Sequence, residues 1–218
     1  VDVPNEYVAD YVGRYKEKLI GFASVDPNDP DSLEELELAI GNLGLKGVKL
    51  SPFYQDYDLM SQKSIKLLRL IKTQKVPILW HLGPDAIAKC HLRYCDINAF
   101  DEIAIMFPEI KMVIAHLANP WIDEGILLIR KHKNVFADMT GLNLRSYFFY
   151  ETMMKVYEYG AMDKILFGSD YPYSTPEIMI NSLLNINKIV RKSGLPKIPI
   201  SEIEKVINRD TLKLLDLS

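Results

Sequence analysis

The chain has 218 residues, of which 48% are apolar and 25% are charged, and its formal net charge is −3. This composition is typical of a globular protein with a large core, and the length predicts one domain over residues 1–218. The weak charge gives no electrostatic reason to expect nucleic acid or an anionic membrane as a partner, and no apolar run approaches the roughly 18 to 20 residues that span a bilayer.

Six apolar runs of strand length recur along the chain, with segments of helical periodicity between them. The expected strands cover residues 19–25, 47–50, 76–82, 112–117, 135–139 and 165–167. The expected helices cover residues 31–40, 61–72, 99–106, 121–130, 147–159, 177–192 and 201–217. Strand and helix alternate with a repeat of about 30 residues, which is typical of βαβ units and predicts an α/β fold with a parallel sheet.

Two α/β architectures fit this alternation. An open doubly wound sheet accepts six strands, whereas a (β/α)8 barrel needs eight strands and about 250 residues. The glycine-rich loop of a dinucleotide-binding fold, G-x-G-x-x-G, does not follow the first expected strand. Composition and spacing leave the open sheet and the barrel equally open.

Three of the expected strands end on a side chain that can carry chemistry, namely His81, His116 and Asp170. Residues two apart share a face of a strand, so we expect His81 to point the same way as Leu79, and His116 the same way as Ile114. In a barrel, the two imidazoles and the carboxylate would converge at the end that holds active sites. These donors suit zinc and other divalent metals, and a metal-bound water could lose its proton to the carboxylate. A core or capping role is the structural alternative for each.

A resemblance to a known family extends over almost the whole chain. It rests on residues 19–27, 44–50, 77–81, 113–117 and 134–138, and above all on the run Ile165-Leu-Phe-Gly-Ser-Asp-Tyr-Pro172. In these runs the chain resembles the amidohydrolase superfamily, particularly the amidohydrolase-related branch that includes aminocarboxymuconate-semialdehyde decarboxylase and pyrone-dicarboxylate lactonase. The resemblance implies a TIM-type (β/α)8 barrel, of which the six expected strands are the third to the eighth.

The resemblance also implies roles for the three strand-end residues. His81 matches a metal ligand, His116 matches a histidine that contacts substrate or metal-bound water, and Asp170 matches an aspartate that is both ligand and proton shuttle. The implied cofactor is a divalent metal, with zinc as the first candidate. Members normally carry His-x-His after strand one, and this chain has no such pair. We therefore expect that it lacks an N-terminal segment with strands one and two; completion by a partner chain and a non-catalytic relative are the alternatives.

Four further residues are candidates for contact with a substrate. Arg145 follows the strand-seven run and offers paired donors to a carboxylate, although a solvated surface position fits it as well. Asn119 and Trp121 follow strand six and are expected to line the pocket, unless Trp121 packs on a helix. Lys49 lies on strand four, where some branches of the superfamily use a carbamylated lysine; here we expect an amine that pairs with a carboxylate or a substrate anion.

The sequence therefore predicts a metal-dependent hydrolase for C–O or C–N bonds of a small carboxylated or cyclic substrate. Asp170 would activate a water, and His116 would position or polarise the developing oxyanion. A non-oxidative decarboxylase of the same branch (a carboxy-lyase) and a metal-free binding barrel without catalysis are the alternatives. The expected partners are a small-molecule substrate and further copies of the chain, with no nucleic acid and no membrane.

Three remaining residues bear on compartment and surface. Cys90 and Cys95 have neither zinc nor redox spacing, so we expect free thiols in a reducing cytoplasm. His132 is flanked by lysines in an expected turn, so we expect its side chain to be solvated.

Overall fold

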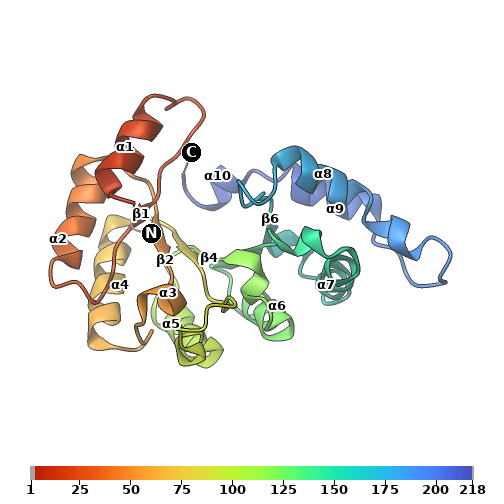
Figure 1. Ribbon diagram of the computed structural model, residues 1–218, viewed down its shortest axis with the longest axis horizontal. Helices are drawn as coiled ribbons and strands as arrows, with labels where there is room; N and C mark the ends of the chain where they lie inside the picture. Colours follow the sequence, from red (N-terminus) through yellow and green to blue (C-terminus); the bar gives the residue numbers. More distant parts are fainter. Residues whose placement is uncertain (1–2, 218) are drawn as a thin grey trace.

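The computed structural model describes residues 3–217. Six parallel strands form one sheet, in which each strand pairs with the next along the chain (Figure 1). The strands are β1 (Ala23–Ser24), β2 (Val48–Leu50), β3 (Ile78–Trp80), β4 (Met112–Ile114), β5 (Val135–Asp138) and β6 (Ile165–Leu166). Each lies within the run expected for it, which confirms the parallel α/β class.

The strand order decides between the two architectures that the spacing allowed. A doubly wound sheet reverses direction at a switch point, so neighbouring strands there are not all consecutive in the chain. The order β1-β2-β3-β4-β5-β6 contains no reversal. A sheet that winds in one direction in this way is consistent with part of a (β/α) barrel.

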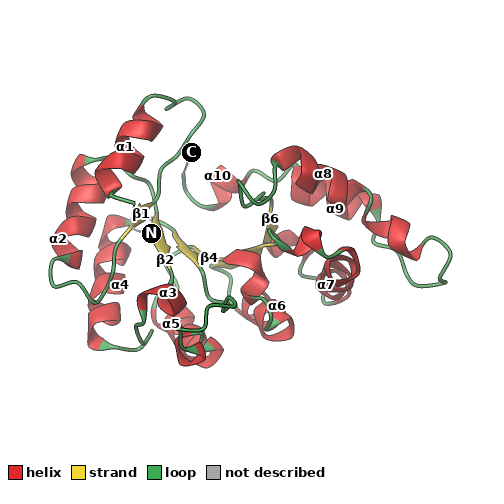
Figure 2. Ribbon diagram, viewed as in Figure 1, coloured by secondary structure: helices red, strands yellow, loops and turns green. Residues whose placement is uncertain are grey.

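The helices lie mainly on the outer side of this sheet, with the exception of α10 (Figures 1 and 2). They are α1 (Asn5–Gly13), α2 (Ser32–Glu37), α3 (Pro52–Gln55), α4 (Gln62–Gln74), α5 (Ile97–Met106), α6 (Ile122–Lys131), α7 (Ser146–Glu158), α8 (Pro176–Leu184), α9 (Ile200–Ile207) and α10 (Thr211–Leu214). Their starts follow local chemistry. The Ser61 hydroxyl accepts a hydrogen bond from the Ser64 amide to cap α4, and the Asp96 carboxylate accepts one from the Asn98 amide to cap α5.

The helices differ from expectation at both ends of the chain. Helix α1 was not predicted, because its outer face is largely exposed tyrosine rather than a clear apolar stripe. The helix predicted over residues 177–192 ends at Leu184, and a 3-10 helix follows over Ile186–Val190. The helix predicted over residues 201–217 is split into α9 and α10. Between these two helices the Arg209 guanidinium donates to the carbonyl oxygens of Ile165 and Met162, both at 3.0 Å, which anchors the break against β6.

The two faces of the sheet have different neighbours. The outward side chains belong to the main core; for example, the Trp80 ring packs edge-on against Phe100 of α5 at 5.8 Å between centroids. The pairing register places Lys49, Leu79 and Val113 side by side on the inward face. A small separate cluster covers that inward face and includes α10 and the residues after it. Its members are Val113, Phe136, Leu166 and Leu215, with Leu79, Leu214 and Leu217 packed against them.

Side chains occupy both free edges of the sheet. At β1, the Asn5 side-chain amide donates to the Ser24 carbonyl oxygen and accepts from the Ser24 amide, both at 2.9 Å, so it replaces the bonds of a further strand. At β6, Arg209 binds the Ile165 carbonyl oxygen, as described above. Exposed edges invite pairing with other chains, and these contacts satisfy edge groups that would otherwise be open.

Candidate functional site

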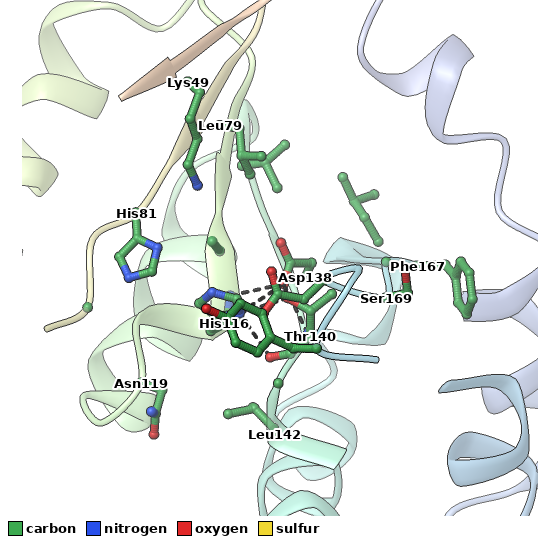
Figure 3. Close-up of a pocket in the computed structure, with 18 of the residues that line it drawn as sticks. Lys49, Leu79, His81, His116, Asn119, Asp138, Thr140, Leu142, Phe167 and Ser169 are labelled. Carbon is green, nitrogen blue, oxygen red and sulfur yellow. Dashed lines mark hydrogen bonds and ion pairs between the residues drawn. The ribbon is translucent and has the colours of Figure 1, made fainter. Parts of the chain in front are cut away.

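One cavity of about 770 Å³ opens where the strands end. Its floor contains the apolar side chains of Leu79, Val113 and Leu166 from the inward face of the sheet. Its rim is lined by polar residues that lie on the strands or follow them. These are Lys49, Tyr54, His81, Asp85, His116, Asn119, Asp138, Thr140, Arg145, Ser169 and Asp170 (Figure 3). The cavity thus joins an apolar floor to a polar rim.

The structure brings most of the predicted site residues to this cavity. His81, His116 and Asp170 all line it, as their positions after strands β3, β4 and β6 suggested. Asn119 and Arg145 line it as well. Their chemical roles stay predictions.

Trp121 is different from the other predicted residues. It precedes α6 and is not among the described residues that line the cavity. The expectation that Trp121 lines the pocket is therefore wrong, because the chain turns away after Asn119 to start α6. The alternative weighed for it, packing beside a helix, fits this position.

His116 reaches the cavity by a route that strand alternation does not describe. Ile114 is fully buried in the outer core, so the expectation that His116 shares its face is wrong. Strand β4 ends at Ile114, and then His116, Leu117 and Ala118 take positive φ angles of 55°, 48° and 57°. Three left-handed residues in a row that are not glycine are costly and need support from their surroundings.

Two glycines make room for this left-handed segment. A Cβ atom on Gly83 would lie 2.1 Å from the Asn119 carbonyl oxygen, and one on Gly125 would lie 2.5 Å from the Leu117 carbonyl oxygen. Either side chain would collide with backbone. The close approach of these backbones is therefore possible only with glycine at both positions.

A hydrogen-bond network from β5 holds His116 in place. The Asp138 carboxylate atom Oδ1 accepts from the His116 amide at 3.0 Å, from the Thr140 amide at 3.0 Å and from the Thr140 hydroxyl at 2.6 Å. His116 Nδ1 lies 2.9 Å from the Thr140 carbonyl oxygen and 2.7 Å from Thr140 Oγ1. Sequence reasoning gave Asp138 and Thr140 no role. The available signal was that Asp138, like His81, follows a buried apolar run.

The neighbouring wall of the cavity, at β2 and after β3, carries Lys49 and His81 (Figure 3). Burial lowers the pKa of Lys49, although Asp138 and Asp170 act in the other direction. Burial, with help from Lys49 and His116, lowers the pKa of His81 to about 4. His81 is therefore neutral at pH 7, the form in which an imidazole accepts hydrogen bonds or binds a metal.

Tyr54 stands beside His81 at the mouth of the cavity. Its hydroxyl lies 3.5 Å from His81 Nε2 and donates to Asp85 Oδ2 at 3.3 Å, so both contacts are long. Burial and the Asp85 carboxylate raise the pKa of Tyr54 to about 12, which keeps the hydroxyl protonated. Tyr54 is thus a donor that a ligand could recruit.

Gly141 separates Asp170 from His116. Its φ of +72° suits glycine, and a Cβ atom there would lie 3.7 Å from His116 Nδ1 and 3.9 Å from Asp170 Oδ2. Asp170 itself has a left-handed φ of 58°, which turns the chain at the cavity after β6. The carboxylate and the imidazole therefore face a shared space.

The polar side chains of the cavity differ from a typical set of metal ligands. Within residues 3–217, no group of three or more His, Cys, Asp or Glu side chains is arranged so that it could hold a metal ion. Metal sites in proteins generally use at least three protein ligands, and here His81 and Asp170 are the predicted pair. The described residues do not fit a metal ion by themselves, so we assign no chemical step to one.

Three residues that do not line the cavity, His132, Cys90 and Cys95, also carried expectations from the sequence. His132 is buried, with Nε2 2.6 Å from Asp101 Oδ1, so the expectation that its side chain is solvated is wrong. A nearby acidic partner on α5 explains why it tolerates burial. Cys90 and Cys95 are free thiols, as expected.

None of the helices in the described part of the chain combines the length and the hydropathy needed to cross a bilayer.

Comparison with known proteins shows which family and fold share these features. The model of the amidohydrolase family matches residues 2–207. A search of curated proteins finds no match. Among solved structures, an uncharacterized TIM-barrel protein from Bordetella bronchiseptica superposes with a TM-score of 0.76 at 19% identity, over 99% of this chain and 73% of that one.

Two further solved structures are similar and have named activities. A probable 2-pyrone-4,6-dicarboxylic acid hydrolase from Acinetobacter baumannii, with citric acid bound, has a TM-score of 0.69 at 17% identity, over 97% of this chain and 78% of that one. A dihydroxybenzoic acid decarboxylase from Polaromonas sp. JS666, with bound manganese and the inhibitor 2-nitroresorcinol, has a TM-score of 0.67 at 13% identity, over 98% and 74%. At such identities the superpositions establish a shared fold and leave the reaction open.

Proposed function

Since the chain belongs to the amidohydrolase family, whose members are enzymes, we propose that it hydrolyses a small carboxylated or cyclic substrate bound in the cavity. Support comes from the chemistry of the rim, which combines cations, imidazoles and carboxylates around an apolar floor. Such a site can bind an organic anion and move a proton beside it. The similarity to a hydrolase of a pyrone dicarboxylic acid agrees with this class of substrate.

One observation carries the substrate class. The Lys49 amine faces the cavity with no hydrogen bond or ion pair to any residue in the described part of the chain. A cation that is largely withdrawn from water and unpaired is unfavourable, and a carboxylate is the partner that corrects it. A substrate carboxylate would supply this partner.

Arg145 offers a second cationic contact on the rim. Its guanidinium lies over the Phe148 ring at 4.9 Å from the centroid, which orients the planar group. Arginine binds carboxylates through two parallel hydrogen bonds. Lys49 and Arg145 together favour a substrate with more than one acidic group.

The side chains of the rim have different roles in the proposed reaction. The Asp170 carboxylate would accept the proton of the attacking water, whose oxygen would add to a carbonyl or lactone carbon. Lys49 and Arg145 would hold the acidic groups of the substrate and so fix which carbon faces Asp170. The apolar floor would exclude bulk water from the far side of the substrate.

Non-oxidative decarboxylation is the alternative reaction. The observation in its favour is the apolar floor of Leu79, Val113 and Leu166 beside the charged rim, because a carboxylate loses CO₂ more readily out of water. The similarity to a dihydroxybenzoic acid decarboxylase agrees with it. A barrel that binds the same anions without turnover is the remaining alternative.

A panel of small pyrone, lactone and aromatic carboxylates tests these possibilities, with release of acid and release of CO₂ measured in parallel. Asp170→Asn should lower turnover by at least about 100-fold, the usual contribution of a positioned acid–base group, with little change in folding. Asp163→Asn changes an exposed aspartate before β6 and serves as the control. Near-normal rates in Asp170→Asn would contradict the mechanism, and binding of the panel without turnover would favour the binding barrel.

The divalent metal, with zinc first and His81 and Asp170 as candidate ligands, stays part of the proposal. The manganese in the decarboxylase supports a divalent metal without selecting zinc. Elemental analysis of protein purified without chelators, beside Asp170→Ala, tests it. Near-stoichiometric metal that is lost in the variant would support the assignment, and metal-free protein in both preparations would remove it.

A homo-oligomeric state and a cytoplasmic location are also kept as predictions.

A further inference from the structure

We propose that Thr140 and Asp138 are positioning residues that keep the proton of neutral His116 on Nδ1, so that Nε2 meets the substrate as a hydrogen-bond acceptor and base. The assignment of the proton rests on hydrogen bonds within the protein. Only its use on a substrate rests on the proposed function.

The Thr140 carbonyl oxygen fixes the position of the proton. It lies 2.9 Å from His116 Nδ1, and a carbonyl oxygen can only accept a hydrogen bond. Nδ1 must therefore be the donor. A neutral imidazole has one N–H, so Nε2 then carries the lone pair.

The Thr140 hydroxyl also indicates that the proton lies on His116 Nδ1, independently of the carbonyl oxygen. Its single proton goes to Asp138 Oδ1 at 2.6 Å, because a carboxylate oxygen can only accept. Toward His116 Nδ1, at 2.7 Å, the hydroxyl oxygen can then act only as an acceptor. Both neighbours of Nδ1 are acceptors, and neither leaves room for a lone pair on that nitrogen.

Asp138 fixes both the orientation of the Thr140 hydroxyl and the position of the His116 ring. Its Oδ1 also accepts from the amides of Thr140 and His116, both at 3.0 Å, so three donors fix this oxygen. The same oxygen lies 3.9 Å from His116 Nδ1. Its negative charge therefore favours the Nδ1 proton, and it would stabilise an imidazolium formed during a reaction.

Nε2 remains available to a ligand. No hydrogen bond joins it to another residue within the described part of the chain, and 22% of the side-chain surface is exposed in the cavity. The His81 ring packs edge-on at 5.2 Å between centroids, which holds the imidazole without using Nε2 as a bonded atom.

The assignment changes the role expected of His116. A neutral Nε2 cannot donate a hydrogen bond to a developing oxyanion, which is what polarisation of the oxyanion would need. It can take a proton from a hydroxyl or water: the O–H bond breaks, the Nε2–H bond forms, and the positive charge comes to lie beside Asp138. Only after that transfer can His116 act as a donor.

The tautomer can be measured without a substrate by ¹⁵N–¹H NMR of protein labelled at histidine nitrogens. The chain has four histidines, so His116→Gln assigns the signals of His116. Spectra are taken about two pH units above the usual histidine pKa of about 6.5. We expect a protonated Nδ1 and an unprotonated Nε2. A protonated Nε2, or rapid averaging of the two forms, would overturn the proposal.

A pair of variants tests the positioning residues. Thr140→Val removes the hydroxyl and should raise the population protonated at Nε2 about fivefold, the effect of one lost hydrogen bond. Thr140→Ser keeps the hydroxyl and should restore the wild-type spectrum. Equal spectra for the two variants would show that Thr140 only supports the backbone. If Thr140→Val does not fold, the wild-type spectrum still decides the tautomer. If the wild-type protein shows the expected tautomer but turns over no member of the substrate panel, the result would count against the proposed function and not against the tautomer.

Discussion

The polar atoms on the two walls of the cavity differ in how many hydrogen bonds they form. On the wall formed after β4 and β5, Asp138 Oδ1 accepts three hydrogen bonds and His116 Nδ1 is shared between two acceptors. On the wall formed after β2 and β3, the only hydrogen bond of His81 Nε2 to a residue among 3–217 is a 3.5 Å contact with Tyr54. Figure 3 shows the dashed bonds gathered around His116 and Thr140, with Lys49 and His81 standing apart.

The difference indicates which groups the protein prepares and which it leaves for a ligand. Groups held by several bonds keep their position when a substrate arrives, so they cost no reorganisation during reaction. A partly buried group without a partner gains a full hydrogen bond or ion pair when the ligand binds. We therefore infer that the network of His116, Thr140 and Asp138 is the chemical part of the cavity, and that Lys49 and His81 are left to contact a substrate.

Removing the centre of the bonded wall should have the largest effect. Asp138→Ala takes away the acceptor of three donors and leaves the His116 amide unpaired within a left-handed segment. We expect unfolding free energy to fall by about 3 kcal/mol, measured by urea denaturation. Asp163→Ala, at an exposed position, should change it by less than about 0.5 kcal/mol. A loss below about 1 kcal/mol for Asp138→Ala would show that the network does not hold the segment.

A pH titration of stability should have the next largest effect, and it reports on the other wall. The pKa of His81 is lowered to about 4 in the folded protein, so the unfolded chain binds a proton first as the pH falls. Stability from this group is complete above about pH 6.5, and it is lost as the pH falls toward 4. We expect a loss of about 2 kcal/mol for this partly exposed group. Chelator-treated protein is unfolded with urea at each pH, and His81→Asn should flatten the slope; equal slopes would contradict the assignment.

The smallest effect on stability is expected for Lys49. Its amine forms no hydrogen bond or ion pair with a residue among 3–217, so Lys49→Met should change unfolding free energy by less than about 1 kcal/mol. Binding of citrate and of aromatic dicarboxylates, measured by calorimetry, should weaken at least about tenfold, because the charge that meets the anion is gone. Lys89→Met, on an exposed loop residue, is the matched control. Unchanged binding in Lys49→Met would remove this wall from the proposed substrate site.

Sequence periodicity predicted the strands well because each one is a short buried run between polar turns. His81 could be placed by alternation, since β3 runs straight up to it and Trp80 faces the outer core as expected. His116 could not be placed by alternation, because it reaches the cavity through an irregular backbone segment. Three left-handed residues follow β4, and the residue types at Ala115 and Leu117 do not predict such backbone angles.

The parts that the sequence missed depend on contacts between distant segments. Thr140 matters because its hydroxyl lies between Asp138 and His116, which is 24 residues earlier in the chain. The C-terminal helix is broken because Arg209 reaches carbonyl oxygens more than 40 residues away, beside β6. A single sequence contains no periodic signal for either arrangement.

The strictly consecutive strand order has a consequence for how the chain folds. Each strand pairs only with the ones before and after it, so the sheet behaves as a linear array of similar units with Asn5 and Arg209 as end caps. In such arrays stability is close to a sum of unit and nearest-neighbour terms, and structure can grow outward from the middle. Amide hydrogen exchange should therefore be slowest in β3 and β4 and become faster toward β1 and β6.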